Sequence, residues 1–313
     1  MTLKIYQSLN EFKPSRKTIV TLGTFDGVHL GHTVILDKIC NIAKQENLES
    51  VLLTFFPHPR FVVNNDAEIK LLNTMSEKAI LLGQKGIQNF IIHPFDKLFS
   101  ELSPREFVEK VLLNQLNIQK IIIGYDHKFG KNRAADFNDL IAFGKEFGFE
   151  VEEISAKQVD EVSVSSTKIR NSLLEGNISL ANVYLGYSYM LSGIVVKGNQ
   201  LGRTIGFPTA NIEVSENYKL IPKNGVYVVS AIVNNQTIFG MMNIGIKPTL
   251  GDNVPTIEVH LLDFSEDIYG QEIQINVIER LRDEQKFESF EALKSQLEID
   301  KTNTLDYFKK GKS

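Results

Sequence analysis

The sequence has few cysteines, no long apolar run and no excess of basic residues, and each shortage excludes a class of protein. A single cysteine among 313 residues, Cys40, excludes an internal disulfide and a multi-cysteine metal site. Its place in an apolar helical pattern favours core packing over catalysis. No apolar run approaches the roughly 18 residues that a membrane helix needs, and residues 1–6 lack the apolar segment of a secretory signal. A net charge of −4 argues against a dedicated nucleic-acid binder.

These absences predict a cytoplasmic protein that binds neither membrane nor nucleic acid, and they leave self-association open. The length of 313 residues suits two domains. We find no low-complexity linker and no internal repeat that would place the boundary, so the change in apolar pattern has to locate it.

Before about residue 185, short apolar runs alternate with helical patterns. This alternation predicts a mostly parallel sheet covered by helices, with ligands at the carboxyl ends of the strands. Ser103–Glu106 combines a serine N-cap, a proline and a glutamate in the order of a capping box, which predicts a helix start. The expected strands are Ile19–Thr24, Val51–Phe56, Phe90–His93, Lys120–Gly124 and Phe149–Ile154.

After Gly186, strand-like runs follow one another without a helical pattern until Ser289. This rhythm predicts a small, closed or nearly closed antiparallel barrel with one C-terminal helix. We therefore expect one domain over residues 1–185 and a second over residues 186–313. The expected barrel strands are Tyr189–Lys197, Gly225–Val233, Thr237–Asn243, Thr256–Asp263 and Glu272–Glu279.

The ten residues Gly23–His32 carry the strongest functional signal. They join a buried-strand pattern to a helical one, so His29 and His32 project from one face of a helix start beside unpaired backbone N–H groups. Such a place binds an anion, most simply a polyphosphate. A lone histidine at a helix start is more often a capping or surface residue, but strand, turn and helix together favour a nucleotide site. The segment resembles the signature of the nucleotidylyltransferases, which implies that both histidines hold a triphosphate and stabilise charge at its α-phosphorus.

Three further segments lie where the expected strands end or a helix starts. Thr54–Arg60 contains a histidine between two prolines, which suits a stiff loop beside a ligand. The alternative is that the prolines only end the strand. Gly124–Arg133 combines two glycines, an aspartate and several basic side chains, and its position favours ligand contact over a solvated loop. Val164–Arg170 is typical of a helix start, with cations that suit phosphate.

Together the four segments resemble the adenylyltransferase half of the bacterial bifunctional riboflavin kinase/FAD synthetases. The sequence departs from that family at Ala135, where glycine is common. The resemblance implies that residues 1–185 form an FMN adenylyltransferase of the Rossmann-like α/β nucleotidylyltransferase class. It implies ATP-binding roles for Gly23, Thr24, Phe25, Asp26, Gly31, Ser166, Thr167 and Arg170, and flavin-binding roles for Pro57, His58, Pro59, Asp126 and Phe129.

The second half has its own candidate site in Gly198–Asn211 and Pro255–Phe264. The first segment is a glycine-rich loop that could wrap phosphates, although it lacks the Gly-Lys-Ser/Thr of a Walker loop and a purely structural role is about as common. Thr209 and Asn211 alternate along a strand, so both oxygens face one side and could hold Mg²⁺. Glu258 is a plausible general base if a nucleotide and an alcohol bind nearby.

These segments, with Asn243–Thr249 and Leu281–Phe287, resemble the riboflavin kinase module of the same family. The resemblance implies a catalytic role for Glu258 as the base that activates the ribityl 5′-hydroxyl. It implies Mg-ATP binding by Gly198, Gly202, Arg203, Gly206, Pro208, Thr209 and Asn211, and flavin binding by Arg282, Glu284 and Phe287.

The sequence therefore predicts that the chain phosphorylates riboflavin to FMN and then adenylylates FMN to FAD, with Mg²⁺ and two molecules of ATP. The alternatives are a chain in which only the kinase step is active, a non-catalytic flavin sensor, and a transferase for another acceptor fused to an RNA-binding barrel. Because His29, His32 and Glu258 are all present, the two-step enzyme is favoured, and the barrel half lacks a basic-aromatic pattern for RNA.

Overall fold

The computed structural model describes residues 2–63, 69–124, 127–154, 164–198, 200–246 and 255–310. Contacts divide the chain into two compact units, Met1–Ser165 and Ser166–Ser313. The sequence predicts a boundary between residues 185 and 186. That two independently folding domains meet there stays a prediction. Asp126, Asn199 and Lys247–Thr249, which belong to predicted site segments, lie outside the described residues.

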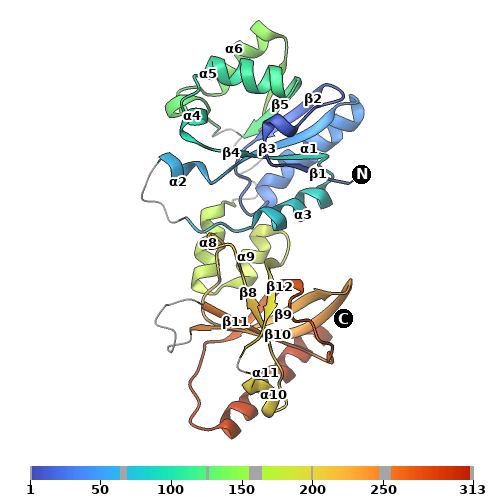
Figure 1. Cartoon of the computed structure of the whole chain (residues 1–313), viewed down its shortest axis with the longest axis vertical. Coiled ribbons are helices and arrows are strands. Elements are labelled where there is room, and N and C mark those ends of the chain that lie inside the picture. The colour runs from blue at the N-terminus through green and yellow to red at the C-terminus, as the bar shows by residue number, and fades with distance from the viewer. Residues whose placement is uncertain are drawn as a thin grey trace. The chain divides into compact units, whose positions relative to one another are not determined.

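The first unit contains a six-stranded sheet in the order β1-β4-β3-β2-β5-β6, and every pairing in it is parallel (Figure 1). The predicted α/β class is therefore confirmed, and each expected strand of this half overlaps an observed one. The edge strand β1 was not predicted. The strands are β1 (Lys4–Tyr6), β2 (Thr18–Leu22), β3 (Glu49–Phe56), β4 (Asn89–Pro94), β5 (Ile118–Gly124) and β6 (Glu150–Ile154).

Helices cover both faces of this sheet. On one face, α1 packs on β2, β3 and β5 and contacts α3. On the other face, the π-helical segment η2 buries Val108 and Leu112 completely in one cluster with Ile121 and Ile123 of β5. Ser103 and Glu106 form the predicted capping box at the start of α5. The helices are η1 (Leu9–Glu11), α1 (Leu30–Gln45), α2 (Pro59–Val63), α3 (Met75–Lys85), α4 (Lys97–Ser100), α5 (Pro104–Glu106), η2 (Phe107–Gln115), η3 (Lys131–Arg133) and α6 (Phe137–Phe147).

The second unit is built on a closed barrel in the order β10-β11-β8-β7-β12-β9, with antiparallel pairings throughout (Figure 1). This confirms the predicted barrel and C-terminal helix. Its elements are α8 (Ser166–Glu175), α9 (Ile178–Leu185), β7 (Tyr189–Val196), α10 (Leu201–Thr204), β8 (Ala210–Glu213), β9 (Gly225–Val233), β10 (Gln236–Ile246), β11 (Pro255–Leu261), β12 (Glu272–Arg282) and α11 (Phe290–Lys310).

Helix α9 belongs to the barrel unit by its contacts. The Asn182 side-chain amide donates to the carbonyl of Val277 at 2.9 Å and accepts from the Tyr189 backbone N–H at 2.8 Å. These bonds join α9 to β12 and to the start of β7, so this helix is attached directly to the barrel.

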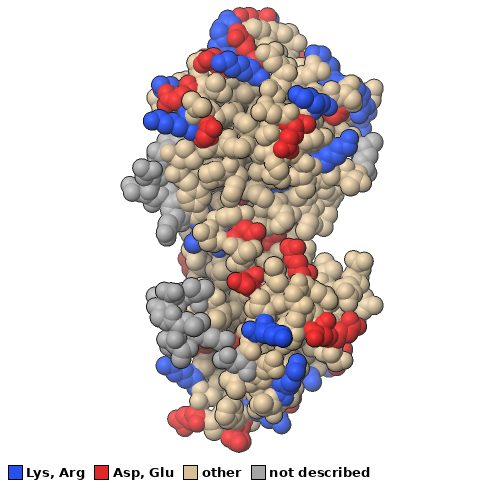
Figure 2. Space-filling model, viewed as in Figure 1, with Lys and Arg blue, Asp and Glu red and all other residues tan. Residues whose placement is uncertain are grey.

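The surface carries both signs of charge. Figure 2 shows basic and acidic side chains interspersed over the visible face, which agrees with the net charge of −4. Cys40 is 6% exposed, as its predicted place in the core requires. Within the described ranges, no helix combines the length and apolarity that crossing a membrane would take.

Candidate functional site

The first cluster lies where β2 ends and α1 begins. His29 is the N-cap residue of α1, and His32 lies in its first turn. Their rings stack with centroids 3.7 Å apart and planes 16° from parallel, and the Phe25 ring lies 4.8 Å from the His32 ring. The structure thus brings the two histidines to one face of a helix start, as the sequence predicts.

Both histidines have pKa values below that of an ordinary imidazole. Burial lowers the pKa of His29 to about 4, against the opposing charge of Asp26. Burial also holds the pKa of His32 well below its ordinary value, with help from the charges of His29 and Lys78. The Nδ1 atoms of both rings are buried and have no hydrogen-bond partner among the described residues. A buried polar atom without a partner is expensive in a folded protein, so these atoms favour a ligand at this place.

The turn between β2 and α1 is held by α3 and by the segment that leads into it. The Asp26 carboxylate accepts from the Leu72 backbone N–H at 2.9 Å, and the Thr24 carbonyl accepts from the Lys78 ammonium at 2.6 Å. Lys78 is 1% exposed. Sequence reasoning missed it, because a lysine within an ordinary amphipathic helix gives no sign of a contact more than fifty residues away.

The other predicted residues of the first half lie at strand ends or at a helix start. His58 follows β3, and its Nδ1 accepts from the Arg60 backbone N–H at 3.2 Å. Phe129 is buried beside Phe107, with ring centroids 5.7 Å apart, and its backbone pairs with Ala135. Ser166, Thr167 and Arg170 lie in the first turns of α8, which belongs to the second compact unit.

The second cluster lies on neighbouring strands of the barrel. Glu258 on β11 pairs in register with Asn211 on β8, and the Thr209 hydroxyl lies 3.5 Å from a Glu258 carboxylate oxygen. Alternation along the chain predicted that Thr209 and Asn211 share a side, and the barrel adds Glu258 to the same place. Three oxygen-bearing side chains therefore lie close together on neighbouring strands.

The glycine-rich loop lies beside these three residues. A Cβ added at Gly198 would overlap the end of the Asn211 side chain, so a larger residue there would displace that amide. Gly202 is the second residue of α10, where a Cβ would overlap the Phe207 carbonyl. The Pro208 carbonyl accepts from Nδ1 of His260 at 2.7 Å, and burial lowers the pKa of that imidazole. Arg203 and Gly206 lie in the same loop, with Gly206 in the left-handed region at φ 89°.

The predicted flavin-side residues of the barrel gather near the end of β12. Arg282 forms a two-pronged ion pair with Asp300 of α11, with Nη2–Oδ2 at 2.7 Å and Nε–Oδ1 at 3.0 Å. The Arg282 guanidinium also lies 5.9 Å from the Phe287 ring centroid. A Cβ at Gly245 on β10 would overlap the Glu284 carboxylate, which places Glu284 against that strand. Asp300 carried no signal in the sequence, because it lies eighteen residues from its partner in a polar stretch of helix.

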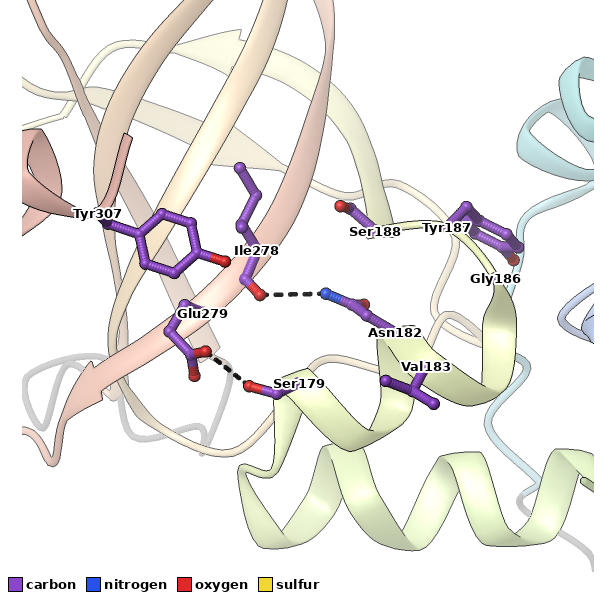
Figure 3. A pocket seen from close by; sticks show the side chains of 9 residues that line it. All are labelled: Ser179, Asn182, Val183, Gly186, Tyr187, Ser188, Ile278, Glu279 and Tyr307. Atoms are coloured by element: carbon purple, nitrogen blue, oxygen red, sulfur yellow. Dashed lines mark hydrogen bonds between the residues drawn. The ribbon is translucent and has the colours of Figure 1, made fainter. Parts of the chain in front are cut away.

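A cavity of about 390 Å³ lies elsewhere on the barrel unit, between α9, β12 and α11 (Figure 3). Ser179 donates to Glu279 at 2.6 Å across it, and Asn182 donates to the Ile278 carbonyl at 3.1 Å. None of the predicted site residues lines it. This cavity is therefore separate from the two clusters described above.

Two stacked histidines at a helix start on a parallel sheet, together with a carboxylate and hydroxyl cluster on a barrel, are the arrangement expected of a two-domain phosphotransferase and nucleotidyltransferase. Residues 11–168 match the FAD synthetase family and residues 185–308 match the riboflavin kinase family. The chain belongs to the family of bifunctional riboflavin kinase/FMN adenylyltransferases.

Individual relatives agree along nearly the whole chain. The bifunctional riboflavin kinase/FMN adenylyltransferase of Listeria monocytogenes is 40% identical over 294 residues, and the match covers 93% of each chain. The enzymes of the same name from Bacillus subtilis and Escherichia coli K12 are 38% and 34% identical, and the matches cover 93% and 94% of each chain. A crystal structure from Streptococcus pneumoniae, described as a macrolide-efflux protein, superposes with a TM-score of 0.86 at 29% identity, covering 97% of this chain and 99% of that one.

Proposed function

We propose that this protein carries out two consecutive steps of flavin synthesis. The barrel transfers the γ-phosphoryl group of ATP to the 5′-hydroxyl of riboflavin, which gives FMN and ADP. The α/β unit then transfers AMP from a second ATP to the phosphate of FMN, which gives FAD and pyrophosphate. The observation that carries the proposal is the presence of both clusters, each on the half of the chain that matches the corresponding family.

In the kinase step, Glu258 is the proposed general base. Its carboxylate would take the proton of the ribityl hydroxyl as that oxygen attacks the γ-phosphorus of ATP. Thr209 and Asn211 lie beside it and would orient the triphosphate, and the close-fitting glycines of the loop leave backbone N–H groups free to approach it. Arg282, Glu284 and Phe287 would hold the flavin.

The residues around Glu258 fit a magnesium ion. Hydroxyl, amide and carboxylate oxygens are ligands that Mg²⁺ accepts, and this ion is usually held by one or two protein groups together with substrate phosphates. Within the described ranges, no group of three or more His, Cys, Asp and Glu side chains forms a ready-made metal cage. Bound with ATP at Thr209 and Asn211, Mg²⁺ would neutralise phosphate charge.

In the adenylyl-transfer step, His29 and His32 would bind the triphosphate as neutral hydrogen-bond donors at the start of α1. An oxygen of the FMN phosphate attacks the α-phosphorus, and pyrophosphate leaves. No covalent intermediate with the protein is needed, because positioning and charge stabilisation suffice. Pro57, His58, Pro59, Asp126 and Phe129 are the proposed flavin contacts, and Gly23, Thr24, Phe25, Asp26, Gly31, Ser166, Thr167 and Arg170 are the proposed ATP contacts.

The alternatives of a kinase with an inactive first half and of a flavin sensor are not favoured, because both domains match their families and the named relatives have both activities in their names. The proposal includes a cytoplasmic location, where ATP is supplied.

The test is a time course with riboflavin, ATP and Mg²⁺, with flavins separated by chromatography and pyrophosphate assayed. FMN should appear first and FAD with pyrophosphate afterwards, and neither should form when the metal is chelated. Accumulation of FMN without FAD would reduce the protein to a kinase, and recovery of riboflavin alone would reject the proposal.

A further inference from the structure

Lys78 is a buried cation that the two-step mechanism leaves unused. Lysine is almost never fully buried unless it is paired, because removing an ammonium from water is expensive. Lys78 is 1% exposed, and the hydrogen bond that its ammonium makes among the described residues goes to the Thr24 carbonyl, at 2.6 Å. Burial lowers the pKa of this ammonium to about 8, while the charge of Asp26 opposes the shift. The side chain is therefore largely charged at neutral pH.

The carbonyl that Lys78 holds belongs to a strained turn. Phe25 and Val28 adopt left-handed backbone conformations at φ 43° and 38°, which are rare for residues other than glycine and most unfavourable for a β-branched one. Such conformations persist only where the surroundings over-determine them. The bond from Lys78 to Thr24 lies at the first residue of this turn, and the bond from Asp26 to Leu72 lies within it.

The same ammonium acts on the stacked histidines. Its charge is one of the reasons that the pKa of His32 lies well below the ordinary value, so Lys78 helps to keep that ring neutral. The unpartnered Nδ1 atoms of His29 and His32 are an independent sign that a polar ligand completes this place. A polyanion would add negative charge to that of Asp26, which already favours the charged form of Lys78.

We propose that Lys78 is a positioning residue of the adenylyl-transfer site, which fixes the Thr24–Val28 turn and the stacked histidines in the arrangement that receives the triphosphate of ATP. The inference rests on the proposed adenylyl transfer. Lys78 acts through its hydrogen bond to the Thr24 carbonyl and through the effect of its charge on His32.

The test compares Lys78→Met with Lys85→Met in the full-length protein. Lys85 lies on the same helix, but its side chain is 37% exposed and its ammonium is 3.9 Å from the Asp37 carboxylate. In Lys78→Met we expect the KM for ATP in FMN adenylylation to rise about tenfold or more and kcat to fall, while the KM for FMN changes little. Lys85→Met should match the wild type in all three constants, and kinase activity should be unchanged in both variants.

A purely structural role would give a different pattern, because partial unfolding lowers the apparent kcat and leaves the KM for ATP unchanged. That pattern in Lys78→Met, or constants within twofold of the wild type, overturns the proposal. If Lys78→Met does not fold, Lys78→Gln replaces it. This variant keeps an N–H donor but removes the charge, which the proposal requires together with the bond to Thr24, so a wild-type KM for ATP in it also overturns the proposal. Should the wild type itself make no FAD from FMN, the proposed function fails instead, so the two failures are distinct.

Discussion

Asp300 supports Arg282 from the C-terminal helix, and replacing it with asparagine should destabilise the barrel unit. The Asp300 side chain is 1% exposed and that of Arg282 is 16% exposed, so the pair is largely removed from water. Breaking a buried pair by removing one partner costs about 3–5 kcal/mol. Asparagine keeps the shape and one oxygen acceptor, and Arg282 retains some hydration, so we expect a loss of about 2–3 kcal/mol. In a unit of this length that lowers the melting temperature by about 4–12 °C.

The assay is loss of kinase activity after brief heating of the full-length protein, with adenylyl transfer measured on the same samples as an internal reference. Because Arg282 also lies near the proposed flavin site, the KM for riboflavin should rise in Asp300→Asn. The matched control is Asp306→Asn on the same helix, where the aspartate is 52% exposed and 3.4 Å from Lys309. An exposed pair of this kind contributes about 0–1 kcal/mol. If both variants lose kinase activity at the same temperature, the Arg282–Asp300 pair does not support the site.

Two further predictions concern the separate units. Burial lowers the pKa of His29 from 6.5 to about 4, so between these pH values the unfolded chain binds a proton that the folded unit excludes, and the first unit should lose stability as pH falls from 6.5 towards 4. In urea unfolding, the stability of His29→Asn/His32→Asn should depend less on pH than that of the wild type, and an equal dependence would contradict the lowered pKa of His29. A fragment that begins at Leu185 should fold and make FMN, but a fragment of residues 166–313 should melt at a higher temperature because it keeps the bonds from Asn182 to β12. Equal melting temperatures of the two fragments would show that α8 and α9 are dispensable for the stability of the barrel.

Local patterns predicted most of what lies within one or two elements. The strand, turn and helix around His29 and His32 were readable because apolar periodicity and glycines lie next to one another in the sequence. The proximity of Thr209 to Asn211 followed from alternation. The approach of Glu258 to both was expected only through the family resemblance, since barrel register is set by pairings between distant strands.

What the sequence did not predict depends on contacts between distant residues. Lys78 and Asp300 are charged residues in helices, where the usual position is a solvated face, and only tertiary packing buries them. Strand β1 is three residues long, too short for a periodic pattern, and it forms because β4 offers a parallel edge. The short helix α10 was likewise missed, because a four-residue helix in a glycine-rich loop has no periodicity.

The central claim is that one chain holds two separate sites, and flavin analysis of Glu258→Gln beside His29→Asn/His32→Asn tests it most directly. Glu258→Gln should make FMN from riboflavin at least about 10²-fold more slowly, yet convert supplied FMN to FAD at the wild-type rate. The histidine variant should phosphorylate riboflavin normally and accumulate FMN. Glu213→Gln, an exposed glutamate on β8, is the control and should do both. Loss of both activities in either variant, or FAD formed from riboflavin at the wild-type rate, would contradict two independent sites.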